Sequence, residues 1–217
     1  MVFDPDVGAG AGGDRMKALR ELWLRELYRA NPVLAITGWL HWALLAVLIA
    51  VYPFDSRTIL GISLWIKPMK FAVSLAIYVW TLAWYLRYLR GHERAVRIIS
   101  WGVAASAVTE IFCITLQAAR GTTSHYNVAI PLDATVFNIM GIMIALNSVL
   151  VAWALVLFCR EQPAISKAYL WGIRLGLALF LLAGVQGGVM IGHGAHTVGA
   201  PDGGPGLPFV NWSTKHG

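Results

Sequence analysis

The sequence is poor in charge and in cysteine. Of its 217 residues only 13% are Asp, Glu, Lys or Arg, whereas a soluble domain usually carries about 25%. This shortage excludes an ordinary water-soluble domain. The two cysteines, Cys113 and Cys159, both fall in apolar segments. They lie near opposite ends in the topology derived below, so we expect no disulfide between them.

The sequence also lacks the alternation of apolar and polar residues that is typical of a transmembrane β-barrel. Instead, 58% of the residues are hydrophobic, and they gather in five continuous stretches. Each stretch is long enough for a helix, rising about 1.5 Å per residue, to cross a hydrocarbon core of about 30 Å. The sequence therefore predicts an all-α polytopic membrane helix bundle. Its predicted transmembrane helices cover residues 33–52, 69–89, 98–119, 134–158 and 169–192.

The domain organisation follows from the composition on either side of these stretches. Residues 1–13 are rich in glycine and predict a disordered tail. Residues 14–31 place Met16, Leu19, Trp23 and Leu27 on one face, which predicts an amphipathic helix lying in the membrane interface. The five-helix domain then spans residues 33–192. Residues 193–217 form a tail rich in Gly and Pro.

The basic residues are distributed unequally over the connectors. Twelve of the 17 Lys and Arg lie in residues 15–29, 87–97 and 160–174. Cytoplasmic loops carry the excess of positive charge, so the N-terminus is predicted to be cytoplasmic and the C-terminus outside. The protein is then a multi-pass protein of the inner (plasma) membrane. Because the charges sit at helix ends, we expect the lipid bilayer and no nucleic acid as partner.

Three unusual polar stretches face outward in this topology: residues 66–71, 120–127 and 192–206. A site at the outer face is therefore expected. The lysines there could contact lipid headgroups or, with Arg120, capture an anionic head, although Asp133 could neutralise Arg120 locally. The candidate residues at this face are Lys67, Lys70, Arg120, His125, Asn127, Asp133 and Asp202.

The three outward stretches also carry a resemblance. KPMKF, QAARGTTSHYN and GAHTVGAPDGGPGLP resemble motifs of a family of uncharacterised bacterial integral membrane proteins, over most of the chain from about Gly61 onward. The family implies a membrane location but no activity. Its members continue past the last motif with further hydrophobic segments, so the resemblance implies that this chain is C-terminally short.

Glu110 is the sharpest single feature, because an ionisable side chain within a membrane span is costly unless it is paired or protonated. Ser106, Glu110, Cys113 and Gln117 follow helical spacing and share one face of the third stretch. Such a stripe lines a bundle interior or a water-filled path. The alternative is a neutral Glu110 that is hydrogen-bonded to a neighbouring helix.

His41 lies near mid-depth in the first stretch, at a depth similar to that of Glu110. It could contact Glu110 in a proton relay or provide an axial ligand to haem. The alternative is a neutral buried histidine that is bonded to a backbone carbonyl.

A second group of histidines belongs to the predicted outer face. His193 and His196 form H-x-x-H, and His125 lies on another outer loop, so the three could hold a transition metal. The glycines around the pair argue against a regular helix there. The sequence leaves the cofactor open, with haem or a transition metal as the candidates.

Glycines recur at four-residue spacing in the last stretch, at Gly184, Gly188 and Gly192. Small residues at this spacing let helix backbones approach closely. We expect them to pack within the bundle, with homo-oligomerisation as the alternative.

Three functional classes remain open. The first is a membrane-embedded redox protein or a metal- or haem-binding protein, which the histidines of the outer stretches favour. The second is a proton-coupled transporter or permease that uses Glu110. The third is a non-catalytic assembly or lipid-binding protein. The sequence names no substrate and does not decide whether the protein is an enzyme.

Overall fold

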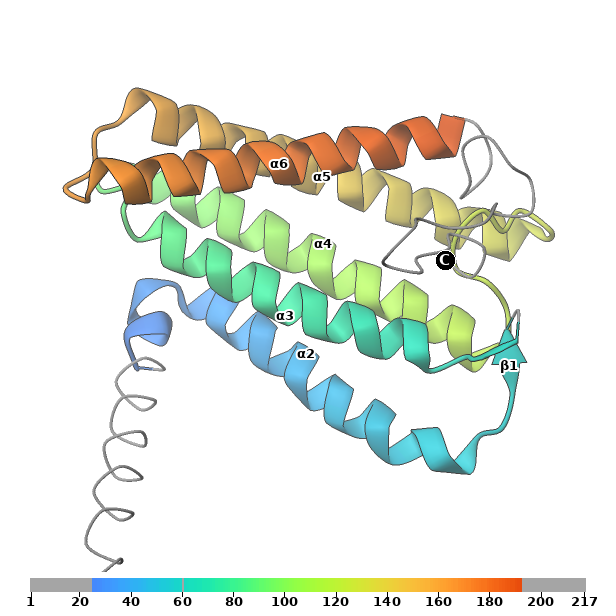
Figure 1. Cartoon of the computed structure of the whole chain (residues 1–217). Helices are drawn as coiled ribbons and strands as arrows, with labels where there is room; N and C mark the ends of the chain where they lie inside the picture. The colour runs from blue at the N-terminus through green and yellow to red at the C-terminus, as the bar shows by residue number, and fades with distance from the viewer. Residues whose placement is uncertain (1–24, 60, 193–217) are drawn as a thin grey trace, which may run out of the picture.

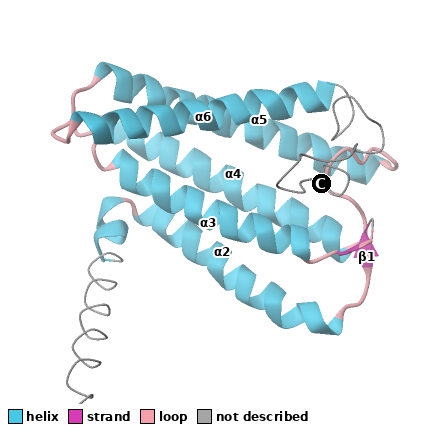
Figure 2. Cartoon of the chain, viewed as in Figure 1, coloured by secondary structure: helices cyan, strands magenta, loops and turns pink. Residues whose placement is uncertain are grey.

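Five long helices make up most of the described structure, a computed structural model that describes residues 25–59 and 61–192. The long helices are α2 (Pro32–Val51), α3 (Ile66–Leu86), α4 (Glu93–Ala119), α5 (Pro131–Arg160) and α6 (Lys167–Gly192). All five are long and apolar enough to cross a membrane. The prediction of an all-α membrane helix bundle is confirmed (Figures 1 and 2).

The helices begin where the local chemistry allows it. Asn31 caps α2, and its side-chain oxygen accepts from Leu34 N at 3.1 Å, with Pro32 in the first turn. α3 begins at Ile66, three residues before the predicted start, because proline is tolerated in a first turn and Pro68 lies there. Likewise α4 begins at Glu93 and not at residue 98, since charged residues at its start also take helical geometry.

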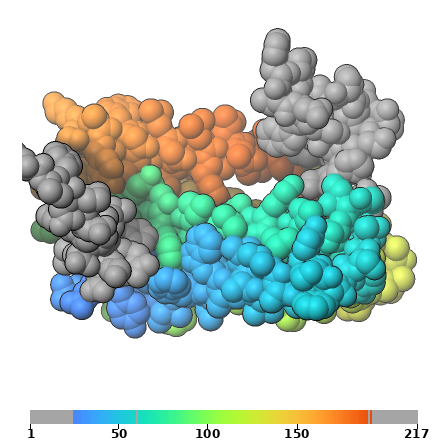
Figure 3. Space-filling model, turned by 60° about the horizontal axis from the view of Figure 1, so that its bottom comes forward, coloured from blue at the N-terminus to red at the C-terminus, as the bar shows by residue number. Residues whose placement is uncertain are grey.

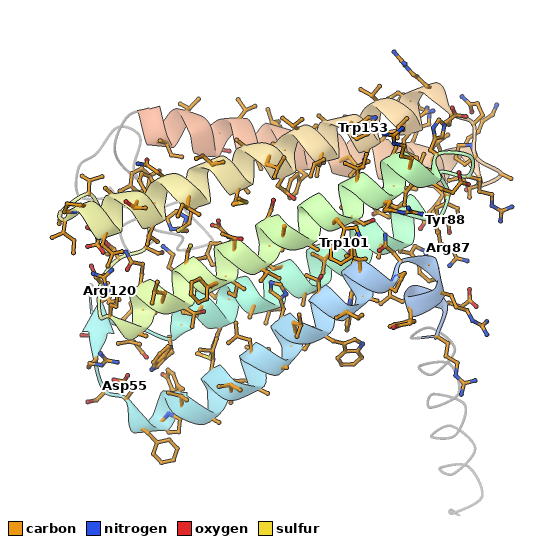
Figure 4. All side chains as sticks on the ribbon, turned by 180° about the vertical axis from the view of Figure 1, so that it is seen from behind. Asp55, Arg87, Tyr88, Trp101, Arg120 and Trp153 are labelled. Carbon is orange, nitrogen blue, oxygen red and sulfur yellow. The ribbon has the colours of Figure 1, made fainter. Side chains whose placement is uncertain are left out.

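Consecutive helices pack side by side, and α2 also packs against α4. Figure 3 shows α2 and α3 along one face of the bundle. The connectors define two ends. We call residues 52–65 and 120–130 the hairpin end, and residues 87–92 and 161–166 the arginine end. In Figure 4, Asp55 and Arg120 lie at the hairpin end, while Arg87 and Tyr88 lie at the arginine end.

The hairpin end contains the only strands of the described residues. A short 3₁₀ helix, η1 (Tyr52–Phe54), leads from α2 into β1 (Thr58–Ile59), which pairs antiparallel with β2 (Ile62–Ser63). Thr58 lies opposite Ser63 in this ladder. Gly61 turns the chain with φ +83°, a conformation that glycine adopts without a steric cost.

Close helix contact depends on different glycines from those expected. A Cβ on Gly38 would lie 2.0 Å from Trp80 Nε1, and one on Gly102 would lie 2.4 Å from Leu150 Cδ1. In α6, by contrast, a Cβ on Gly188 would meet nothing within 4 Å, and one on Gly184 would make an ordinary contact at 3.4 Å. The expectation that the α6 glycines pack tightly within the bundle is therefore wrong for Gly188. The surroundings of Gly192 lie outside the described part, and homo-oligomerisation stays a prediction.

The apolar residues divide between a core and an outward surface. The largest buried cluster joins α2, α3, α4, α5 and α6 and includes Leu34, Val79, Val103 and Phe158. Many large apolar side chains face outward instead, as on α6, where Leu175, Leu179, Leu182 and Val185 are all more than half exposed. A lipid-facing surface accounts for this exposure, because hydrocarbon tails are as apolar as these side chains.

Only part of the predicted interfacial helix is described. Residues 25–30 are helical, Leu27 is buried, and Glu26 pairs with Arg87 at 3.5 Å, which attaches this segment to the arginine end. The tails predicted at residues 1–13 and 193–217 lie outside the described residues. So do the candidates His193, His196 and Asp202.

A candidate polar site at Glu110 and His125

Glu110 projects from α4 into the bundle. Ser106, Cys113 and Gln117 on the same face are buried, and the side chain of Glu110 keeps only 12% exposure. About 14 Å of helix separates Glu110 from the end of α4 at Ala119. The carboxyl group therefore lies well inside the span, on the face that the spacing predicts.

His125 meets Glu110 from the α4–α5 loop. Its Nε2 lies 3.9 Å from Glu110 Oε1, within ion-pair range but beyond a direct hydrogen bond. Nδ1 lies 3.0 Å from Ser124 Oγ. The ring also lies between Phe71 of α3 and Phe137 of α5, with centroids at 6.2 and 6.3 Å. Residues from three helices thus hold an imidazole against the carboxyl group.

The backbone next to His125 is strained. Tyr126 has φ 56°, which is the left-handed region and is unusual for a bulky residue. Its ring packs on Phe137 at 5.5 Å, and burial raises the pKa of its hydroxyl. Strain of this kind persists only where surrounding contacts hold it. Here it turns the loop so that His125 faces the bundle.

Lys67 is the third charged group of the site. It lies in the first turn of α3, is partly buried, and interacts electrostatically with Glu110 without a direct ion pair. Lys70, one turn further along α3, is exposed. Of the two lysines, the structure therefore brings only Lys67 to Glu110.

One oxygen of Glu110 has no hydrogen-bond partner. Oε2 is buried and unpartnered among the described residues, whereas Oε1 faces His125. A buried polar atom without a partner is costly. A proton on this carboxyl group would remove its charge, and the neighbouring imidazole is chemically able to supply or accept that proton.

The other predicted residues of the hairpin end form a separate network around Asp133, which is buried at the start of α5. Asp133 accepts hydrogen bonds from Gln117 Nε2 at 3.0 Å, from Asn127 Nδ2 at 3.0 Å and from Arg120. Arg120 also donates to Gln117 Oε1. The arginine is thus neutralised locally, and the network fixes the loop that carries His125.

A second group of hydrogen bonds at this end, around Asp55 and Arg57, was not predicted from the sequence. Arg57 donates to Asp55 at 2.7 Å and, through Nη1, to the backbone oxygen of Ala119 at 3.0 Å. Trp65 Nε1 donates to Asp55 at 3.1 Å. The Arg57 guanidinium lowers the pKa of Asp55 to about 2. Together these bonds tie the β1–β2 hairpin to the end of α4.

His41 does not belong to the Glu110 site. It is 1% exposed, and its Nδ1 lies 2.7 Å from the backbone oxygen of Thr37. No hydrogen bond or ion pair joins it to Glu110, so the relay between these two residues is not formed. Its Nδ1 is bonded to a backbone carbonyl, as the alternative prediction for His41 expected. Its Nε2 has no partner.

The described residues contain no ready metal site. Within residues 25–59 and 61–192, no three His, Cys, Asp or Glu side chains gather closely enough to hold a metal ion. His125 instead contacts Glu110. Since His193 and His196 lie outside this part of the chain, the metal site predicted from all three histidines stays a prediction.

Two separate hydrogen-bonded polar pairs also lie inside the bundle. Tyr78 donates to Asn147 Oδ1 at 2.9 Å, and Asn147 is 4% exposed. Nearer the arginine end, Asn31 Nδ2 donates to Ser100 Oγ at 2.6 Å. Neither pair was predicted from the sequence. An amide within an otherwise apolar stretch, as at Asn147, was the available signal.

Comparison of the chain with protein-family models, with curated proteins and with solved structures finds no match.

Proposed function

We propose that this protein is a membrane permease that moves protons across the bilayer, with Glu110 as the group that is protonated and deprotonated in each cycle. The observation that carries the proposal is the contact between Glu110 and His125 inside the bundle, 3.9 Å apart, with the second carboxyl oxygen unpartnered. Intramembrane carboxyl and imidazole groups are the usual components of proton relays.

Each charged residue then has a distinct role. His125 exchanges the proton between Glu110 and the hairpin end, because it comes from the loop at that end. Lys67, which is partly buried in the first turn of α3, adds a positive charge near Glu110. Two polar pairs, Tyr78–Asn147 and Asn31–Ser100, support a path toward the arginine end.

The proposed orientation in the membrane is based on the distribution of basic residues. We propose that the arginine end is cytoplasmic and that the hairpin end faces outward across the plasma membrane, because exposed Arg90, Arg94 and Arg160 lie at or beside the arginine end. Glu110 is then protonated from the outside through His125.

The test is proton flux into proteoliposomes that enclose a pH-sensitive dye, driven by a potassium diffusion potential. The protein is expected to acidify the lumen faster than empty liposomes, and Glu110→Gln is expected to abolish the difference. Glu93→Gln is the matched control, because Glu93 starts the same helix but is exposed. An inactive native protein, or equal flux in the native protein and Glu110→Gln, would overturn the proposal.

A further inference from the structure

A cavity of about 240 Å³ lies between α2 and α4 on the opposite side of α4 from its polar stripe. Its mouth is formed by Leu40, Val108 and Phe112, which are 56%, 42% and 64% exposed. These side chains belong to the apolar surface that faces lipid. The cavity therefore opens toward the hydrocarbon and not toward either end of the bundle.

Two polar atoms without partners belong to residues that line this cavity. They are His41 Nε2 on α2 and Thr115 Oγ1 on α4. His41 is 99% buried, since its exposure is 1%. Val108, Ile111, Phe112 and Thr115 follow i, i+3, i+4 and i+7, so the cavity-facing stripe of α4 is distinct from the stripe that carries Glu110.

The bond at Nδ1 decides what His41 can bind. The Thr37 carbonyl oxygen only accepts hydrogen bonds, so Nδ1 at 2.7 Å must carry the hydrogen. In the neutral imidazole Nε2 is then left with a lone pair, and it can only accept. The hydroxyl of Thr115 can donate or accept. A ligand hydroxyl that donates a hydrogen bond to His41 Nε2 would satisfy this atom.

The size and the apolar lining select the remainder of the ligand. An apolar cavity of about 150 Å³ accommodates benzene, so this larger cavity has room for a substituted ring. Both polar atoms are buried. A ligand therefore reaches them with a small rotamer change of the lining side chains, which is common on binding.

We propose that this cavity is a binding site for a lipid-soluble phenol or alcohol, whose hydroxyl group donates to His41 Nε2 and whose apolar body lies between α2 and α4. The site does not include Glu110, so ligand binding there can be tested independently of proton transport.

The probe is 4-pentylphenol, and its methyl ether, 4-pentylanisole, is the matched ligand without a donor. Binding to the full chain in detergent is measured by calorimetry. The phenol is expected to bind about tenfold more tightly than the ether, as for one hydrogen bond to a buried acceptor. Equal affinity for phenol and ether in the native protein would overturn the proposal.

Two further variants locate the site without removing His41, whose loss could prevent folding. Val108→Phe fills the mouth and is expected to abolish phenol binding. Val47→Phe makes the same change on α2 at a lipid-facing position outside the cavity, with 57% exposure, and should bind normally. Binding that survives Val108→Phe, or that is lost equally in both variants, would place the ligand elsewhere and overturn the assignment.

Discussion

Glu110 and His125 face each other at 3.9 Å even though one lies within a membrane-spanning helix and the other in the loop beyond its end. The loop folds back toward the bundle, and its imidazole reaches the carboxyl group between Phe71 and Phe137. A titratable pair is thereby placed between the hairpin end and the interior. This arrangement supports proton exchange more directly than any other feature of the described residues.

Asp133→Ala is expected to destabilise the protein by about 1–3 kcal/mol. The change removes the acceptor of Gln117, Asn127 and Arg120. The buried amides of Gln117 and Asn127 then lack this partner, whereas the exposed Arg120 can be hydrated. Reversible unfolding in mixed micelles measures the loss. Asn138→Ala on the exposed side of α5 is the control and should change stability by less than about 0.5 kcal/mol. A small effect of Asp133→Ala would show that the network does not support the loop.

Gly38→Ala and Gly188→Ala should have opposite consequences. In the first variant the new methyl group overlaps Trp80, whose ring is held against Trp39 and Trp42. Overpacking of this kind costs about 1–3 kcal/mol. In the second variant the methyl group enters open space, and the helix gains up to about 1 kcal/mol from the better propensity of alanine. The melting temperatures of both variants are measured in the same detergent. Equal melting temperatures for Gly38→Ala and Gly188→Ala would contradict the close contact between Gly38 and Trp80.

Acid should weaken the ion pair between Asp55 and Arg57 at the hairpin end. The pKa of Asp55 falls from 3.8 to about 2 when the protein folds, because Arg57 donates to it. A lowered pKa contributes stability that is complete above about pH 4 and is lost as the pH falls through about 2. The slope of stability against pH between 4 and 2 is expected to decrease in Asp55→Asn. An unchanged slope would show that Asp55 is not paired in the folded protein.

The native cysteines test the proposed orientation without any substitution. Cys159 is exposed beside the arginine end, while Cys113 is buried in α4. A membrane-impermeant maleimide should therefore label inside-out vesicles and leave intact spheroplasts unlabelled. Ser56→Cys, at the exposed hairpin end, should become labelled in spheroplasts. Labelling of the native protein in spheroplasts would reverse the topology.

The sequence predicted the number and approximate extent of the helices, because apolar run length is what a bilayer selects. It placed Glu110, Cys113 and Gln117 on one face, which helical spacing determines. The predicted starts of α3 and α4 were late by three and five residues. Lys67, Pro68 and the charged residues at the start of α4 precede the apolar runs but are already helical.

The partner of Glu110 could not be predicted in the same way. The position of His125 depends on the positive φ of Tyr126 and on the side-chain network that fixes the loop. Neither follows from periodicity. Close packing at Gly38 was also missed, because the glycine stripe of α6 suggested a different contact. The close contact at Gly38 is made with Trp80 of α3.

The bonds around Asp133 also bear on the order of folding. Asp133 is separated from Arg120 by 13 positions and from Gln117 by 16, so the network joins neighbours in the chain. Contacts of such low sequence separation form quickly. The α4–α5 pair can thus close as soon as both helices have been inserted, before α6 emerges from the ribosome. The scaffold that holds His125 is then an early product of synthesis rather than its last.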